Sequence, residues 1–324
     1  MAHTPCPCLR AAAALCCCVL LAACGTIDGP AAAARQLPPL LHHGAPITLA
    51  DAAATGPAPD LLALTPEMRE FVARYAPRGG GARQRMLSLH EAVKGQGTLG
   101  LAYDPFADGT AASVFRTGAA NCLSFAHLFV ALAREAGLDA RYQWLEVRPE
   151  WTRVGERVAV RLHVNVMVRM PSGEQFMVDI DPLQSRDIAA SRLLEDADAA
   201  ALDLNNIAME ALARGDLEAA WIGLARALQL SPGLPLLWVN LGAAYRHAKQ
   251  LEEAEWALFQ ALAIDRGDRS AMNNLVVLYG QMGRDADRDY WMGRVKHYLA
   301  QQEALRQREL AETQSAAEPG STRI

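Results

Sequence analysis

The last third of the chain repeats itself every 34 residues, and this period constrains the fold more than any other feature. Small and apolar residues recur at matched positions of successive segments. The first set is Leu204, Ile207, Ala208, Ala211, Ala220, Leu224, Ala227 and Pro232. One period later the same positions hold Trp238, Leu241, Gly242, Tyr245, Ala254, Leu258, Ala261 and Arg266. Such a period is typical of stacked helix pairs and predicts an all-α solenoid over residues 201–302.

This pattern resembles the tetratricopeptide repeat, whose signature is Trp, Leu-Gly, Tyr, Ala, Phe, Ala and Pro at these offsets. The resemblance divides the region into repeats 201–234, 235–268 and 269–302, of which the middle one matches best. It implies a groove that binds a protein partner. An unrelated Ala-rich helical bundle is the alternative. Residues 303–324 are expected to be a helix end followed by a disordered tail.

The seven cysteines are distributed unevenly, with six in the first 24 residues and the seventh at Cys122. This distribution is not that of a disulfide framework, and Cys122 has no nearby cysteine with which to form a zinc site. The net charge of −5 argues against a general nucleic-acid binder. We therefore expect neither a metal nor a cofactor, and no nucleic-acid partner.

The start of the chain has the form of an export signal. Arg10 precedes an apolar stretch that ends in Leu21-Ala22-Ala23-Cys24, which resembles the bacterial lipobox. The resemblance implies a signal peptide over residues 1–23 and a lipid-modified Cys24 in the bacterial cell envelope. Because the next residue is Gly and not Asp, an outer-membrane lipoprotein facing the periplasm is expected. An ordinary signal peptide is the alternative. Residues 24–64 are rich in Ala, Pro and Gly and are expected to form a flexible tether.

Helices and strands alternate in the middle of the chain. Thr65 and Pro66 are typical of a helix start, and further helices are predicted over 82–93 and 111–117. An apolar run after Cys122 predicts a buried helix, whose N-terminus favours a thiolate. Alternation of apolar residues predicts strands over 141–147, 158–168 and 176–180.

Three residues in this region form a constellation suited to thiol chemistry. Cys122 stands at a helix start, His163 on the non-core face of a strand, and Asp179 on the non-core face of the next strand. A nucleophile, a base and a group that orients the base are what amide cleavage or transfer through a thiol requires. The backbone N–H of Cys122 is a candidate oxyanion donor.

The surrounding motifs resemble those of bacterial transglutaminase-like cysteine proteins, closest to the exported subgroup with tetratricopeptide repeats. The matching motifs are Asn121-Cys122-Leu123-Ser124-Phe125, Leu162-His163-Val164-Asn165-Val166 and Val178-Asp179-Ile180-Asp181. The resemblance implies a papain-like α+β core over residues 65–195, a Cys-His-Asp triad, peptide or protein amides as substrates, and no metal in the catalytic step.

The acid of the triad has two candidates. Asp179 and Asp181 share a strand face, and a hairpin with its loop at 171–173 would pair His163 with Asp181. The closer subgroup carries its acid at the position of Asp179, which we therefore prefer, with Asp181 as the alternate. His127 is expected to be structural because it lies five residues beyond Cys122 on the same helix. Tyr103 and Asp104 are weaker candidates for lining the cleft.

Together these observations predict a lipid-anchored cysteine hydrolase or acyltransferase acting on peptide or protein amides, with repeats that recruit substrate or partner. A catalytically silent scaffold that binds proteins through the repeats is the alternative. A redox sensor built on Cys122 is a third, weaker hypothesis.

Overall fold

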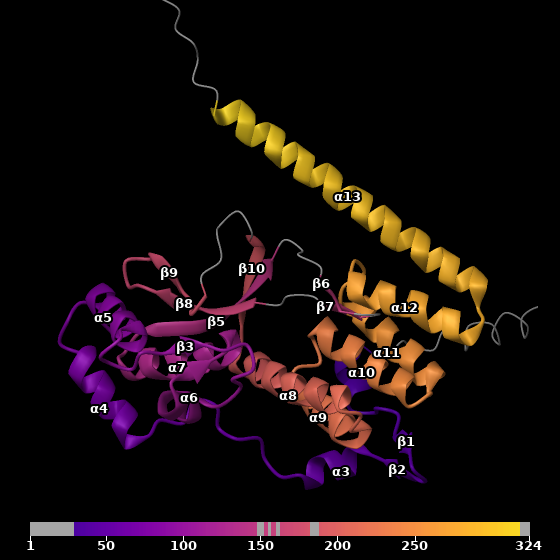
Figure 1. Ribbon diagram of the computed structural model, residues 1–324, viewed down its shortest axis with the longest axis horizontal. Coiled ribbons are helices and arrows are strands. Elements are labelled where there is room, and N and C mark those ends of the chain that lie inside the picture. Colours follow the sequence, from indigo (N-terminus) through magenta and orange to yellow (C-terminus); the bar gives the residue numbers. More distant parts are fainter. Residues whose placement is uncertain (1–28, 148–151, 155–156, 160–162, 182–187, 318–324) are drawn as a thin grey trace, which may run out of the picture.

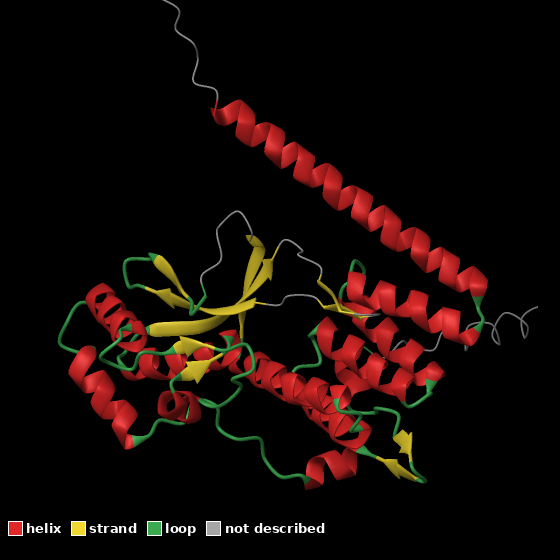
Figure 2. Ribbon diagram, in the orientation of Figure 1, coloured by secondary structure: helices red, strands yellow, loops and turns green. Residues whose placement is uncertain are grey.

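The computed structural model describes residues 29–147, 152–154, 157–159, 163–181 and 188–317. It has two regions, a mixed core of helices and strands and a region made only of helices (Figures 1 and 2). The helix α8 follows the last strand of the core and leads into the second region. The α+β core and the paired helices agree with the predicted fold class at this level.

The core is built on one antiparallel sheet with the strand order β10-β5-β8-β9. Its strands are β5 (Asp139–Val147), β8 (His163–Arg169), β9 (Gln175–Val178) and β10 (Ile188–Leu194). Helix α7 (Cys122–Glu135) packs against β5 and β8, with Phe125 and Phe129 fully buried. Since α7 is apolar on most of its circumference, burial between sheet and neighbouring helices is the expected outcome.

The remaining helices of the core begin where the sequence predicts. They are α4 (Pro66–Tyr75), α5 (Ala82–Lys94) and α6 (Ala111–Thr117). The Thr65 side chain caps α4 by accepting a hydrogen bond from the Met68 N–H. The Thr110 side chain caps α6 in the same way, with the Ser113 N–H as donor. Short parallel strands β3 (Ala102–Tyr103) and β4 (Ala119–Ala120) join the chain before α6 to the chain before α7.

Two strand predictions need correction. The described residues of the strand predicted over 158–168 belong to two sheets, because β7 (Arg157–Ala159) pairs with β6 (Thr152–Val154) whereas β8 pairs with β5 and β9. The strand predicted over 176–180 ends at Val178. Alternation alone cannot separate a strand in the central sheet from a small hairpin, since both have a period of two. Strand β10 was not predicted.

The C-terminal region consists of helix pairs. They are α8 (Asp196–Ala213) with α9 (Leu217–Leu230), α10 (Pro235–His247) with α11 (Leu251–Ile264), and α12 (Arg269–Met282) with α13 (Asp285–Ala317). The second helices of the pairs begin at residues 217, 251 and 285, which are 34 residues apart. A Cβ atom added to Gly223 would lie 2.8 Å from the Cβ of Ala208, so small residues allow α8 and α9 to approach closely.

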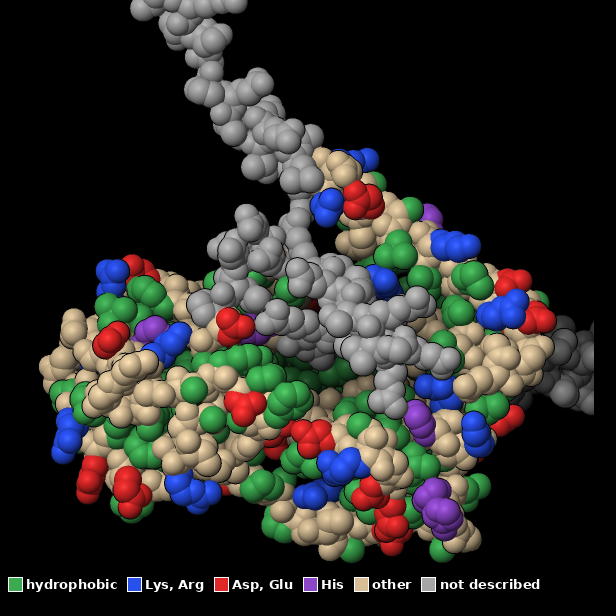
Figure 3. All heavy atoms as spheres, in the orientation of Figure 1, with side chains coloured by type: hydrophobic (Ala, Val, Ile, Leu, Met, Phe, Trp, Pro, Cys, Tyr) green, Lys and Arg blue, Asp and Glu red, His purple; other side chains and the backbone are tan. Residues whose placement is uncertain are grey.

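The last helix, α13, continues to Ala317 and projects beyond α12 (Figure 1). The predicted tail beyond it lies outside the described residues. On the face in Figure 3, acidic and basic side chains are interspersed over both regions. Within the described part of the chain, no helix is both long and apolar enough to cross a membrane.

The predicted flexible tether is wrong for most of its length. Residues 30–54 form α2 (Pro30–Ala34), β1 (Leu40–His42), β2 (Ala45–Ile47) and α3 (Leu49–Ala54), which pack on the C-terminal helices. The side chain of Gln250 accepts from the Leu41 amide at 2.8 Å and donates to the Pro39 carbonyl at 3.1 Å. Composition predicted flexibility because these elements are too short to show periodicity.

Loss of the Gln250 side chain should release this N-terminal segment. For Gln250→Ala we expect the Leu41 amide to exchange with solvent faster, and the free energy of unfolding to fall by about 1 kcal/mol because a partly buried N–H loses its partner. Hydrogen exchange and urea unfolding measure the two effects. Gln301→Ala, on the exposed part of α13, is the matched control and should change neither.

Candidate active site

The start of α7 is fixed by a reciprocal pair of hydrogen bonds. The side chain of Asn121 accepts from the backbone N–H of Ser124 at 2.9 Å, and the Asn121 N–H reaches the Ser124 hydroxyl at 3.0 Å. This capping box makes Cys122 the first residue of the helix. The nucleophile candidate therefore has a defined position, and the predicted helix start is confirmed.

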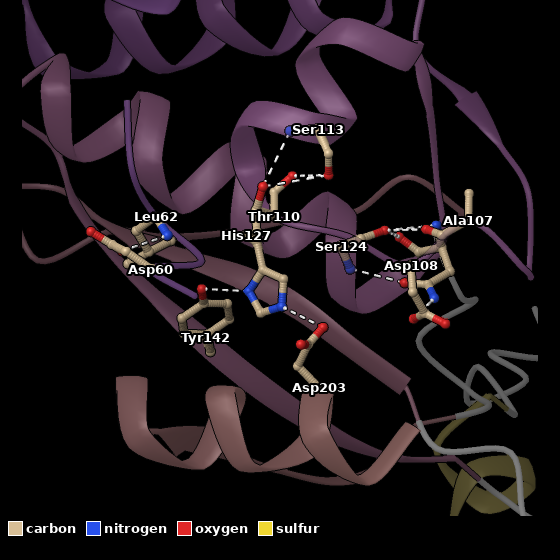
Figure 4. A network of polar contacts seen from close by, with 11 residues as sticks. Asp60, Leu62, Ala107, Asp108, Thr110, Ser113, Ser124, His127, Tyr142 and Asp203 are labelled. Carbon is tan, nitrogen blue, oxygen red and sulfur yellow. Dashed lines mark hydrogen bonds and ion pairs between the residues drawn. The ribbon is translucent and has the colours of Figure 1, made fainter. Parts of the chain in front are cut away.

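The same two side chains hold the loop before α6. The Ser124 hydroxyl donates to the Ala107 carbonyl at 2.6 Å, and the Asn121 N–H also reaches this carbonyl, at 3.1 Å. The Asn121 side-chain amide donates to Asp108 at 2.5 Å. Figure 4 shows Ala107, Asp108 and Ser124 gathered at the start of the helix. Loop 104–108 is thus part of the site.

His163 and Asp179 form a buried pair. The Nε2 atom of His163 lies 2.5 Å from Oδ2 of Asp179, and the two side chains are only 4% and 7% exposed. Both had been assigned to a non-core face, but both faces of β8 are buried at this end of the strand. The pairing leaves Nδ1 as the ring nitrogen available to a thiol.

The end of β9 decides which of the two aspartates contacts His163. The register pairs Val166 with Val178, and its extension would set Asp181 opposite His163, as the hairpin argument predicted. The strand stops at Val178 instead, and Asp179 turns toward His163. The Asp181 N–H donates to Oδ1 of Asp179 at 3.1 Å, so Asp181 supports the acid through its backbone.

Lys94 holds the chain at this turn. Its ammonium group, at the end of α5, donates to the carbonyls of Asp179 at 3.5 Å and Ile180 at 3.2 Å. A cavity of about 220 Å³ lies beside the turn. Its lining residues are His90, Lys94, Leu145, Asn165, Met177, Asp179 and Ile188.

Cys122 meets β8 directly after His163. The backbone N–H groups of Val164, Leu123 and Cys122 lie near the thiol and favour its anion, whereas the nearby charge of Asp179 disfavours it. Burial is the largest influence and raises the pKa of the Cys122 thiol, with the Asp179 charge adding to it and the three N–H groups opposing it. The predicted preference of a helix N-terminus for thiolate is therefore outweighed by burial.

His127 lies away from this constellation, in agreement with its predicted structural role. It is fully buried, with Nδ1 2.8 Å from the Tyr142 hydroxyl and Nε2 3.7 Å from a carboxylate oxygen of Asp203 on α8 (Figure 4). Near it, Arg134 and Asp196 form a double hydrogen bond of 2.6 and 2.8 Å. These contacts attach the first C-terminal helix to the core.

The structure describes two of the three other residues that the sequence singles out, Tyr103 and Asp104 but not Cys24. Tyr103 and Asp104 are exposed and stand on β3 and the loop that follows, next to the start of α7. Cys24 lies outside the described residues. Within the described ranges, no group of three His, Cys, Asp or Glu side chains is placed to hold a metal ion.

Sequence reasoning missed Lys94 and Asp108. Lys94 stands in the last turn of α5, where a cation is ordinary at a helix C-terminus, so nothing linked it to a residue 85 positions away. Asp108 precedes a glycine in a loop, where aspartate is common. The only sequence feature that could have pointed to Asp108 is a second polar residue, Asn121, which also precedes Cys122.

Comparison with known proteins adds one finding. Residues 70–180 match the model of the transglutaminase-like superfamily, a range that contains Cys122, His163 and Asp179 and stops one residue before Asp181. The chain therefore contains a transglutaminase-like core domain, followed by a C-terminal region of paired helices. No curated protein matches the chain.

The Asn121–Asp108 contact can be tested through stability. Asn121→Asp keeps the capping oxygen but removes the donor to Asp108 and places two carboxylates together. We expect a loss of about 2 kcal/mol in the free energy of unfolding at neutral pH, measured by urea unfolding.

The loss should shrink on acidification. Like charges raise the pKa of one carboxyl in the folded state above its unfolded value, so the destabilisation is present at higher pH and fades as that group protonates. Asp104→Asn is a control on the same loop that does not alter the Asn121–Asp108 contact. An Asn121→Asp variant equally destabilised at every pH would contradict the assigned contact.

Proposed function

We propose that this protein is a cysteine hydrolase or acyltransferase of transglutaminase-like type that acts on peptide or protein amides. One observation carries the proposal. The thiol of Cys122 lies near the backbone N–H of Val164, the residue after His163, and His163 is itself paired with Asp179 at 2.5 Å. The candidate nucleophile, base and orienting acid thus lie together within the matched domain, with His163 and Asp179 buried and Cys122 partly buried.

The chemistry begins with proton transfer from the thiol to Nδ1 of His163. Sulfur attacks the carbonyl carbon of the amide, forming a C–S bond and a tetrahedral oxyanion, for which the Cys122 backbone N–H is the candidate donor. His163 then protonates the leaving nitrogen as the C–N bond breaks, which leaves a thioester. Water or an amine, deprotonated by His163, attacks the thioester, and the thiol is regenerated.

Asp179 acts through His163. Its carboxylate fixes the ring orientation and stabilises the imidazolium that forms after proton transfer. Because burial raises the pKa of the free thiol, Cys122 alone would be a poor nucleophile near neutral pH. Proton transfer to His163 replaces an isolated buried charge with a thiolate–imidazolium pair, and this is why the base is needed.

Alkylation of Cys122 by iodoacetamide across a pH series tests the proposal. The wild-type protein should react near neutral pH with a rate that rises through a low apparent thiol pKa. In His163→Ala the same rise should occur only at alkaline pH, because the buried thiol then ionises without a partner. Mass spectrometry of the Cys122 peptide measures the rate.

Two further variants distinguish the role of Asp179 from that of Asp181 in the same alkylation experiment. Asp179→Asn should reduce the neutral-pH rate, whereas Asp181→Asn should leave it near the wild-type value because Asp181 contacts Asp179 through its backbone N–H. A wild-type thiol that titrates like an ordinary cysteine and is unaffected by His163→Ala would overturn the proposed nucleophile.

The C-terminal helices and the leader complete the proposal. The 34-residue spacing of α9, α11 and α13 supports tetratricopeptide repeats that recruit a protein substrate or partner. The lipobox supports lipid attachment at Cys24 and an outer-membrane location facing the periplasm. Since α2 begins at Pro30, only Gly25–Gly29 would separate the lipid from the fold, a reach of roughly 20 Å.

Membrane attachment is tested by replacing the acylated residue. Cys24→Ser should move the protein from the membrane fraction to the soluble fraction of the cell envelope, because a thiol is required for acylation. Cys18→Ser, within the same leader, is the matched control and should stay membrane-bound. Immunoblotting of the fractions reads the result. Retention of Cys24→Ser in the membrane would contradict lipid anchoring at this residue.

A protein-binding scaffold is the second candidate function. The raised pKa of the Cys122 thiol favours it, because a protonated buried thiol is a filler and not a nucleophile. On this alternative, a full-length Cys122→Ala variant retains every partner and every phenotype of the wild-type protein. The alkylation series separates the two candidates.

A further inference from the structure

An aromatic side chain stands almost fully in solvent on the loop that is hydrogen-bonded to the start of α7. Phe106 is 86% exposed, the highest value among the large hydrophobic residues that the structure describes. Tyr103, on the adjoining strand, is 44% exposed. Isolated exposed apolar residues are common on protein surfaces. Phe106 differs from such residues in the position of its loop and in the hydrogen bonds that order this loop.

The loop that carries Phe106 is held internally by hydrogen bonds. The Asp104 carboxylate accepts from the Phe106 N–H at 2.9 Å, and the Asp104 carbonyl accepts from the Ala107 N–H at 3.1 Å. The Asp108 N–H donates to the Phe106 carbonyl at 3.1 Å. Phe106 is thus displayed by an ordered turn, and contact with a ligand would cost little further backbone entropy.

The loop is also fastened to the residues that precede Cys122. Tyr103 pairs with Ala120, and the Ala107 carbonyl accepts from both the Asn121 N–H and the Ser124 hydroxyl. The Asn121 side chain donates to Asp108. The network that defines the position of the thiol therefore also defines the position of Phe106.

We infer that Phe106 is a specificity-determining residue that receives an apolar side chain of the substrate polypeptide next to the amide attacked by Cys122. This inference rests on the proposed function. An exposed aromatic face on a preorganised loop gains most from covering aliphatic or aromatic surface. Asp104 and Asp108 flank Phe106, so an acidic side chain is the least favourable occupant.

The test uses thiol-directed peptide probes that reach both sides of the reactive atom. Epoxysuccinyl peptides carrying leucine on both sides of the ring are compared with matched peptides carrying glutamate, by the second-order rate of Cys122 alkylation in the full-length protein. The wild-type protein should prefer leucine. Phe106→Ser should lower the leucine-probe rate about tenfold, the usual scale for one apolar contact. The glutamate-probe rate should fall little, so that the preference collapses.

Matched variants make the result specific. Phe106→Leu should retain most of the preference, and Phe259→Ser, an exposed phenylalanine on α11, should retain all of it. Iodoacetamide, which has no peptide side chains, should react equally with wild type and Phe106→Ser. Equal thermal unfolding temperatures show that the variants are folded.

The outcomes distinguish this inference from the proposed function. A leucine preference that survives in Phe106→Ser, with a normally activated thiol, overturns the role of Phe106 alone. An absence of any preference in the wild type overturns it as well. An unactivated thiol in the iodoacetamide series overturns the proposed function, and the role of Phe106 as a substrate contact falls with it.

Discussion

The end of the β8–β9 pairing is the constraint on which the site depends. The ladder reaches Val166 and Val178 and stops, with Lys94 holding the departing chain by two carbonyls. Because the pairing stops there, Asp179 can turn toward His163, and the Val164 N–H is left near the Cys122 thiol. A ladder three residues longer would set Asp181 opposite His163 and occupy that amide. One strand end therefore decides both which aspartate contacts His163 and which backbone N–H lies near the thiol.

Helix α7 places Cys122 at that strand end, where two opposing influences act on the ionisation of its thiol. Its first N–H groups stabilise negative charge on sulfur, while the low-dielectric surroundings and Asp179 penalise it. Burial is the larger influence and raises the pKa of the thiol, which is why the proposed chemistry relies on His163 as a base. The capping box of Asn121 and Ser124 serves this arrangement by setting the start of α7 and the loop that faces it.

The helical region is discontinuous in sequence. Residues 30–54 pack on α9–α11, although these helices come much later in the sequence. The transglutaminase-like core lies between the two segments along the chain. Arg134–Asp196 and His127–Asp203 join the core to α8. The core is thus attached through both of its chain connections, which limits its freedom to move relative to the helices.

Local pattern by itself determined much of this protein. It predicted the α+β core followed by paired helices, the starts of α4, α6 and α7, the hairpin register and the place of Cys122, because caps and periodicity act over a few residues. Only the tertiary structure decided that β9 stops at Val178, that Lys94 holds the turn, that burial raises the thiol pKa, and that residues 30–54 are ordered. Each of these depends on contacts between segments far apart in sequence, and composition and period carry no record of such contacts.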